Sequence, residues 1–343
     1  MSTATILMGI AGLHRAWPHR GGGLSVELRD RAGRLRAARV TPTGSLHPSP
    51  FATDPRLPAL HPGLGGTLVV HRLHRRAVVL TGERAIKLLR PGRAQEALGA
   101  HRALEPLIRA VGLGAARILD SQPARIDTAL LPGSSLYSLG EAGRAGWEAL
   151  AAAWPGLVAG PAGAEGLAAH RGEQEAAVLW QWFTTASRHG LLPAPEALGR
   201  QVTAVCRALE EGGGTLVPAH RDLHDAQLLW DGSALSLLDL DTACRAEAAL
   251  DLGNLLAHVE LAGLQGRLGA AGLNRVLGLL EAMGRALPTS PERVSVYRQG
   301  ARLRLACVHA YRPSAWPWLA DWVDHCLSAP IEPTTTMMKE SAT

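Results

Sequence analysis

The chain has 343 residues, 47% of them hydrophobic and 19% charged, so it can bury a core, and its length predicts about two lobes. Its four cysteines lie far apart without a CxxC pair, which excludes a disulfide scaffold and predicts core thiols (Cys206, Cys244, Cys307 and Cys326). No apolar run reaches the roughly 18 residues that span a bilayer. We therefore expect a cytoplasmic protein without membrane contact.

The net charge of +5 is distributed unevenly along the chain. Residues 1–134 carry 19 Lys and Arg against 8 Asp and Glu, a balance of +11, and residues 135–343 carry 16 against 22, a balance of −6. A basic first part suits an anionic partner and an acidic remainder suits a cationic one, but an uneven solvated surface explains both as well. The basic first part is the only feature that would suggest a nucleic-acid partner, so we expect none.

The basic residues are almost all arginine. Of 35 Lys and Arg residues, only Lys87 and Lys339 are lysines, and Lys339 lies in a polar tail. Lys87 is thus the one lysine expected in the folded body, within a strand-like run. Since this sequence otherwise uses arginine for positive charge, the position indicates a need for a compact ammonium group.

The first part of the chain predicts strands and one helix. Runs at 24–30 and 35–40 predict a β-hairpin, and the Pro- and Gly-rich residues 41–66 predict a loop. Three short apolar runs then predict an antiparallel meander (67–71, 77–81 and 85–89). The spacing becomes helical over 93–111, and two further strands are expected (117–120 and 128–131).

After residue 140 the sequence predicts mostly helices, near 143–153, 172–187, 194–211, 248–263, 270–286, 291–310 and 314–327. A strand pair interrupts them at 228–230 and 235–240, around the turn Asp231-Gly232. The pattern predicts an α+β protein: an N-lobe over 1–131, comprising an antiparallel β-sheet with one helix and an N-terminal hairpin extension, and a mostly helical C-lobe over 132–329. We expect the polar residues 330–343 to be a disordered tail.

The stretch HRDLHDAQLLWDGSALSLLDLD, within the catalytic-loop segment 218–241, contains the most chemistry. Asp222 lies in a loop, Gln227 follows five residues later, and Asp239 and Asp241 come after a tight hairpin. Such a hairpin brings the Gln227 amide oxygen and the Asp239 carboxylate together, as ligands suited to Mg²⁺. Asp222 would orient a hydroxyl or accept its proton, and Asp241 would contact a second ion or cap the strand. This arrangement predicts a site for phosphoryl transfer.

The opening His220-Arg221-Asp222-Leu223 matches the protein-kinase motif H-R-D-L-x-x-x-N, with Gln227 in place of the Asn. The segment resembles still more closely the aminoglycoside phosphotransferase and choline-kinase-like family of small-molecule kinases. There the loop reads HxDxxxxN and a metal-binding Asp follows a short hairpin, as in Leu238-Asp239-Leu240-Asp241 here. The resemblance covers roughly residues 67–310 and implies a bilobal protein-kinase-like fold, ATP or GTP between the lobes, and Mg²⁺.

The resemblance also assigns residues in the N-lobe. It implies that Lys87 binds the α- and β-phosphates and that Glu96, on the following helix, pairs with Lys87; Glu105 is the other candidate. No GxGxxG loop is present. Three arginines around the first turn of the meander either help to hold phosphates or form a solvated turn (Arg72, Arg75 and Arg76). In the C-lobe, we expect His220 and Asp251 to have structural roles around the catalytic loop.

These residues predict an ATP-dependent phosphotransferase that moves the γ-phosphate to an alcohol group of a small molecule. The resemblance implies an aminoglycoside or other antibiotic, a sugar or an amino alcohol, and the acidic C-lobe favours a cationic acceptor. Two alternatives stay open. One is a kinase for Ser or Thr of a peptide during natural-product biosynthesis. The other is a nucleotide-binding pseudokinase, because Gln227 replaces Asn and the Gly-rich loop is missing.

Overall fold

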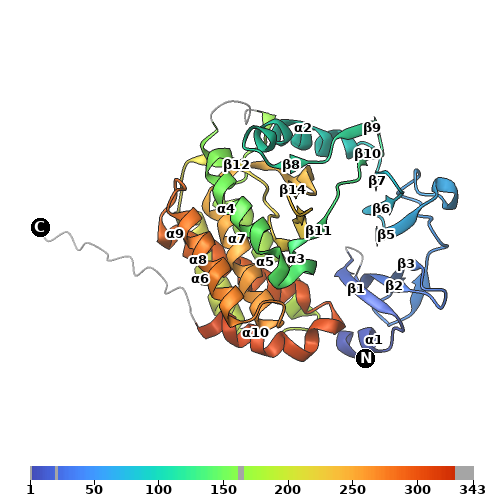
Figure 1. The fold of residues 1–343 in the computed structure, drawn as a ribbon. Helices are drawn as coiled ribbons and strands as arrows, with labels where there is room; N and C mark the ends of the chain where they lie inside the picture. The colour runs from blue at the N-terminus through green and yellow to red at the C-terminus, as the bar shows by residue number, and fades with distance from the viewer. Residues whose placement is uncertain (1, 20–21, 161–165, 329–343) are drawn as a thin grey trace, which may run out of the picture.

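The computed structural model describes residues 2–19, 22–160 and 166–328 (Figure 1). The predicted tail, 330–343, lies outside the described residues. Strands dominate the first part and helices the second, which gives the α+β class expected from the sequence. Among the described helices, none combines the length and apolar character needed to cross a membrane. The four cysteines are free thiols, and all but Cys206 are buried.

The chain begins with a short helix, α1 (Thr3–Met8), and a four-stranded antiparallel sheet. Its strands follow chain order: β1 (Leu13–Pro18), β2 (Leu24–Arg29), β3 (Leu35–Val40) and β4 (Leu46–Pro48). The predicted hairpin is the β2–β3 pair, whose buried positions form the apolar runs. The sequence does not indicate β1 and β4, because edge strands expose their side chains and lack a clear apolar pattern.

The second sheet has five strands in the order β5-β6-β7-β10-β9. The elements are β5 (Thr67–Arg72), β6 (Arg76–Leu80), β7 (Arg84–Leu89), α2 (Ala94–Ala110), β9 (Ile118–Gln122) and β10 (Arg125–Ala129). Arg72 lies opposite Arg76, and Val78 lies opposite Lys87. Opposite residues, and residues two apart on a strand, share a face. Arg72, Arg76 and Lys87 therefore point to the same side of this sheet.

The second half contains the helices that the spacing predicts, within a few residues: α4 (Arg144–Ala159), α5 (Gly172–Arg188), α6 (Pro195–Glu211), α7 (Ala249–Leu264), α8 (Ala270–Gly284), α9 (Pro291–His309) and α10 (Trp316–Ser328). Short α3 (Leu136–Leu139) precedes them. Two small sheets complete this half. One has the strand order β11 (Ser134–Ser135), β13 (Leu228–Trp230), β14 (Leu235–Leu237) and β8 (Gly114–Ala115). The other pairs β12 (Leu216–Ala219) with β15 (Cys244–Glu247). The β13–β14 hairpin positions the predicted chemical residues.

The N-terminal sheet packs on both halves of the molecule (Figure 1). Leu24 and Val26 share one hydrophobic cluster with Tyr311 and with Trp322 of α10, and the Ala16 amide donates to the Tyr311 carbonyl at 3.2 Å. Leu35, on β3, instead packs among residues of the five-stranded sheet and the segment before it. The predicted extension is thus an integral layer that connects the strand-rich and helical parts.

Candidate active site

Lys87 contacts two of the predicted metal-binding carboxylates. Its ammonium nitrogen lies 2.5 Å from Asp239 Oδ1 and 2.6 Å from Asp241 Oδ2. The Lys87 side chain is 19% exposed, so these charges interact with limited solvent screening. Burial alone would raise the pKa of Asp239, but Lys87 and then Arg76 hold it well below its usual range. Both groups of the central pair are therefore charged.

The backbone turns sharply at Asp239. This residue has φ = 56°, in the left-handed region that Asp tolerates better than most residues. The chain then enters a short 3₁₀ helix, η5 (Leu240–Thr242), which packs against α2. The turn brings Asp239 and Asp241, two residues apart, to the same ammonium group.

Asp222 lies in a loop that is fixed to the same region. The His220 ring donates from Nε2 to the Leu238 carbonyl at 2.7 Å, next to Asp239, and the Thr242 hydroxyl donates to the His220 carbonyl at 3.2 Å. Asp222 is half-buried, and no hydrogen bond to its carboxylate occurs within the described ranges. The carboxylate is thus available to a hydroxyl group of a bound molecule.

Helix α7 braces this loop from behind. The Asp251 carboxylate accepts hydrogen bonds from the backbone amides of His220 and Arg221, at 2.7 and 2.8 Å, and Asn254 donates to the Leu223 carbonyl at 2.9 Å. Burial raises the pKa of Asp251 to about 6, against the opposing effect of His220. The expected structural roles of His220 and Asp251 are confirmed.

Gln227 ends a 3₁₀ turn, η4 (Asp225–Gln227), directly before β13. Its carbonyl accepts the Leu238 amide at 2.9 Å, so the hairpin places its backbone opposite the residue before Asp239. Asp239 and Asp241 already converge on one cation, and together with the Gln227 amide oxygen they would form an all-oxygen donor set. Such a set fits Mg²⁺ better than a softer metal.

Within the described residues Glu96 forms no ion pair with Lys87, so the predicted Lys87–Glu96 pair is wrong. The Glu96 side chain is 67% exposed, and its carboxylate pairs with Arg93 at 2.8 Å. The reason is helical phase: Ala94, Ala97 and Leu98 occupy the buried face of α2, and Glu96 points away from it. The alternative, Glu105, pairs with Arg109 at 2.9 Å.

The sequence prediction gave His101 no role, and it named Arg76 as a candidate phosphate-binding residue without predicting its contact with Asp239. His101 lies on the buried face of α2, where burial lowers its pKa against the opposing effect of Glu105, whose carboxylate lies 3.6 Å from the His101 ring, and of Asp241. Arg76 contacts Asp239 Oδ2 at 3.3 Å. The signal for His101 was its place in the apolar stripe of the predicted helix. For the Arg76–Asp239 contact the sequence carries no signal, because the contact depends on the strand register that places Arg76 two residues from Val78, the partner of Lys87.

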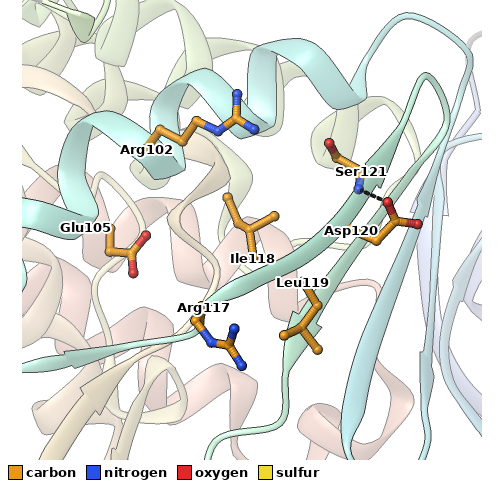
Figure 2. Close-up of a pocket in the computed structure, with 7 residues that line it drawn as sticks. All are labelled: Arg102, Glu105, Arg117, Ile118, Leu119, Asp120 and Ser121. Atoms are coloured by element: carbon orange, nitrogen blue, oxygen red, sulfur yellow. Dashed lines mark hydrogen bonds between the residues drawn. The ribbon is translucent and has the colours of Figure 1, made fainter.

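A hollow of about 470 Å³ lies between α2 and β9, and of the site residues named from the sequence only Glu105, the alternative partner of Lys87, lines it (Figure 2). Arg102 and Glu105 come from the helix, and Arg117 and Asp120 from the other wall. Since β9 is an edge strand of the five-stranded sheet and β5 is at the opposite edge, the hollow is separate from the Arg72–Arg76 end.

No family model matches the chain, and no curated protein sequence matches it. Solved structures do. An aminoglycoside phosphotransferase of the APH(2″) class, in complex with GDP and kanamycin, superposes with a TM-score of 0.50 at 13% identity, covering 76% of this chain and 91% of that one. The APH(3″)-Id enzyme of Streptomyces rimosus, with ADP and streptomycin, has a TM-score of 0.49 at 20% identity over 68% and 90% of the two chains.

A glucosamine kinase in complex with glucosamine, ADP and phosphate covers 96% of both chains, with a TM-score of 0.45 and 14% identity. At such identities a structural likeness establishes the fold. The strand-rich part, the helical part and the match to the kanamycin-bound structure agree. The chain therefore has the protein-kinase-like fold of the aminoglycoside phosphotransferase and choline-kinase-like family.

Proposed function

We propose that this protein is a phosphotransferase that moves the γ-phosphoryl group of ATP or GTP to a hydroxyl of a small molecule. The observation that carries the proposal is the meeting of Lys87, from the five-stranded sheet, with Asp239 and Asp241, from the loop after β14. The Asp222 loop is hydrogen-bonded to the residue that precedes Asp239. Charge neutralisation and positioning are the main requirements of phosphoryl transfer.

Each residue then has a role. Lys87 binds the α- and β-phosphates, Asp239, Gln227 and Asp241 hold Mg²⁺, and Asp222 orients the acceptor hydroxyl and accepts its proton. The metal supplies neutralisation of phosphate charge when it is bound. The braces from Asp251 and Asn254 keep the Asp222 loop in one conformation, which reduces the entropy that positioning would otherwise cost.

For the acceptor we propose a small hydroxylated molecule. The similar APH(2″) structure holds kanamycin. The acidic balance of residues 135–343 favours a cationic acceptor of this kind.

The test measures Mg²⁺-dependent phosphate transfer from ATP and from GTP to a panel of aminoglycosides, sugars, amino alcohols and Ser/Thr peptides. Wild type is compared with Asp222→Asn, Asp239→Asn and, as a control, Arg144→Gln, whose side chain is 60% exposed on α4. We expect one small-molecule class to be phosphorylated. Both Asp variants should lose about 100- to 10,000-fold in rate, and the control should keep wild-type activity.

Transfer that survives Asp222→Asn unchanged would contradict the assigned roles. Transfer to peptides alone would replace the small-molecule acceptor with the peptide alternative. Tight nucleotide binding with no transfer to any panel member would favour the pseudokinase.

A further inference from the structure

Two histidines and an aspartate gather beside the catalytic loop, and the proposed mechanism uses none of them. His224 and Asp225 begin the turn η4, and His258 lies on α7. One metal-ligating atom of each residue lies within 4.8 Å of those of the other two. Among the residues that the structure describes, no other group of three His, Cys, Asp or Glu side chains meets this condition. The cluster is separate from the carboxylates of Asp239 and Asp241, which face Lys87.

Asp225 has one carboxylate oxygen without a partner. The residue is 2% exposed. Its Oδ2 accepts a hydrogen bond from Arg267 at 2.7 Å, but its Oδ1 accepts none from any described residue. This Oδ1 lies 3.6 Å from His224 Nδ1 and 4.0 Å from His258 Nδ1. A buried acceptor without a donor costs free energy. A cation held between Oδ1 and the two rings would remove that cost, and Arg267 already fixes the direction of the carboxylate.

The two imidazoles can offer lone pairs to such a cation. The Ala226 amide donates to His224 Nδ1 at 3.2 Å, so this nitrogen carries a lone pair and no hydrogen. Burial, and then the nearby His224 and Arg304, lower the pKa of His258 well below its ordinary value. Its ring is therefore neutral, which is the form that binds metal ions. The charge of Arg304 is already engaged, because its guanidinium donates to Asn254 Oδ1 at 2.6 Å.

The donor set selects the kind of metal. Two imidazole nitrogens and one carboxylate oxygen suit Zn²⁺, whereas Mg²⁺ prefers oxygen ligands alone. Ligands about 2.0–2.1 Å from a tetrahedral Zn²⁺ lie about 3.3 Å from one another. The 3.6 and 4.0 Å separations therefore need to close by less than about 1 Å.

Binding also requires a change in the rings. His224 and His258 are stacked, with centroids 4.4 Å apart and planes inclined by 9°. Parallel stacked rings cannot both direct a lone pair at one ion, so one ring must turn out of the stack. The metal must also replace the Ala226 amide at His224 Nδ1.

We propose that His224, Asp225 and His258 form a binding site for a divalent transition-metal ion, with Zn²⁺ as the best match and a fourth position open to water. The bound ion connects η4, in the catalytic loop, to helix α7 behind it. The proposal goes beyond the proposed function and does not depend on it, because the metal is bound without nucleotide or acceptor.

The test measures the Zn²⁺ dissociation constant of untagged protein by competition with a chromophoric chelator, in excess Mg²⁺. The proteins are wild type, His224→Ala, His258→Gln and two controls. His47→Ala removes an exposed histidine on β4, and Asp239→Asn alters the proposed Mg²⁺ site. Wild type should bind one Zn²⁺ with a dissociation constant below about 1 μM. Each variant of His224 or His258 should weaken binding at least about 100-fold, since it removes a direct ligand. Both controls should match wild type.

A second measurement reports the geometry. Wild type loaded with Co²⁺ should show the visible absorption of a tetrahedral site, and both the His224 and His258 variants should lose it. Thermal melts establish which variants are folded. If His258→Gln does not fold, His224→Ala decides, because the His224 side chain is 18% exposed.

Three results would overturn the inference. If wild type binds no Zn²⁺ tightly, a proton shared by His224 and Asp225 satisfies the carboxylate instead. If tight binding survives in the folded His224 and His258 variants, the metal is held by other histidines. If Asp239→Asn alone abolishes it, Zn²⁺ occupies the proposed Mg²⁺ site.

Discussion

At the scale of single residues, the centre of the site is one ammonium group between two carboxylates. Lys87 reaches Asp239 and Asp241 at 2.5 and 2.6 Å, from a side chain that is 19% exposed. A planar guanidinium is larger and directs its donors in a fixed plane, so it cannot replace this point contact. The scarcity of lysine elsewhere in the chain agrees with a requirement for lysine here.

We predict that Lys87→Arg lowers kcat/KM for phosphate transfer by about 100-fold, because the guanidinium cannot occupy the space between the two carboxylates. Initial-rate kinetics measure the effect, and a thermal melt shows whether the variant is folded. A variant with near wild-type kcat/KM would show that any cation at this position suffices.

Gln227 gives a second prediction at this scale. Its amide oxygen can replace that of Asn as a metal ligand, so Gln227→Asn should change kcat less than about threefold. Gln227→Ala, which removes one oxygen ligand, should raise the Mg²⁺ concentration for half-maximal activity about tenfold. A Mg²⁺ titration of the activity separates the two variants. An unchanged Mg²⁺ requirement in Gln227→Ala would exclude Gln227 from the metal site.

At this scale the sequence predicted one site that comprises Lys87, Asp222, Asp239 and Asp241. The structure brings Lys87 into contact with Asp239 and Asp241. Motif spacing carries that information because a tight hairpin fixes which residues meet. The contact of Arg76 with Asp239 was not predicted, because it depends on strand register, which the sequence alone does not specify.

At the scale of elements, helix α7, which braces the Asp222 loop, is joined to α9 and α10 by buried charges. Glu260 on α7 accepts from Arg302 of α9 at 2.6 Å, pairs with Arg298 and lies 3.2 Å from the His325 ring of α10. Burial opposes its ionisation, but hydrogen bonds from His325 and Arg302 lower the pKa of Glu260 to about 2. The ionised Glu260 therefore connects three helices.

This network gives a pH-dependent prediction. The folded-state pKa of Glu260 is depressed, so its stabilisation is present above the ordinary pKa of about 4.5 and is lost as pH falls toward about 2. Glu260→Gln should lower the free energy of unfolding at pH 7 by about 3 kcal/mol, because it leaves Arg302 without its buried counter-charge. Urea unfolding between pH 7 and pH 3 measures this. The gap between wild type and variant should narrow below about pH 4.5; a constant gap would contradict the role of Glu260.

Elements with long apolar periodicity were predictable, and short or exposed ones were not. The seven long helices after residue 140 coincide with the predicted ranges because each buries a continuous stripe. The Glu96 error arose within a correctly predicted helix. The residue type fitted the role, but Ala94, Ala97 and Leu98 determine which face of α2 is buried, and that face excludes Glu96.

At the scale of the whole molecule, the N-terminal sheet connects the strand-rich part and the helical part, which carry Lys87 and the Asp239 loop respectively. Residues of this sheet such as Leu24 and Val26 share a hydrophobic cluster with α5, α6, α7, α9 and α10. Leu35 of the same sheet packs in a second cluster with residues of the five-stranded sheet. The sequence predicted a hairpin at this position but not its packing partners, because a contact such as that of Ala16 with Tyr311 joins residues at opposite ends of the chain.

The shared core predicts cooperative unfolding. Leu24 is 2% exposed within that cluster, so Leu24→Ala should cost about 2–5 kcal/mol in the free energy of unfolding. Because the cluster includes the helices, differential scanning calorimetry should show a single transition shifted to lower temperature. An early separate transition, with the helical part unchanged, would show that the sheet folds as an independent unit.

The measurement that tests the central claim most directly is ATP binding with and without Mg²⁺, since it needs no knowledge of the acceptor. Isothermal titration calorimetry compares wild type with Asp239→Asn and Asp222→Asn. We predict that wild type binds ATP more tightly with Mg²⁺, that Asp239→Asn loses this dependence with at least about a tenfold weaker affinity, and that Asp222→Asn binds like wild type. Absence of ATP binding, or Mg²⁺-dependent binding that survives in Asp239→Asn, would contradict the account.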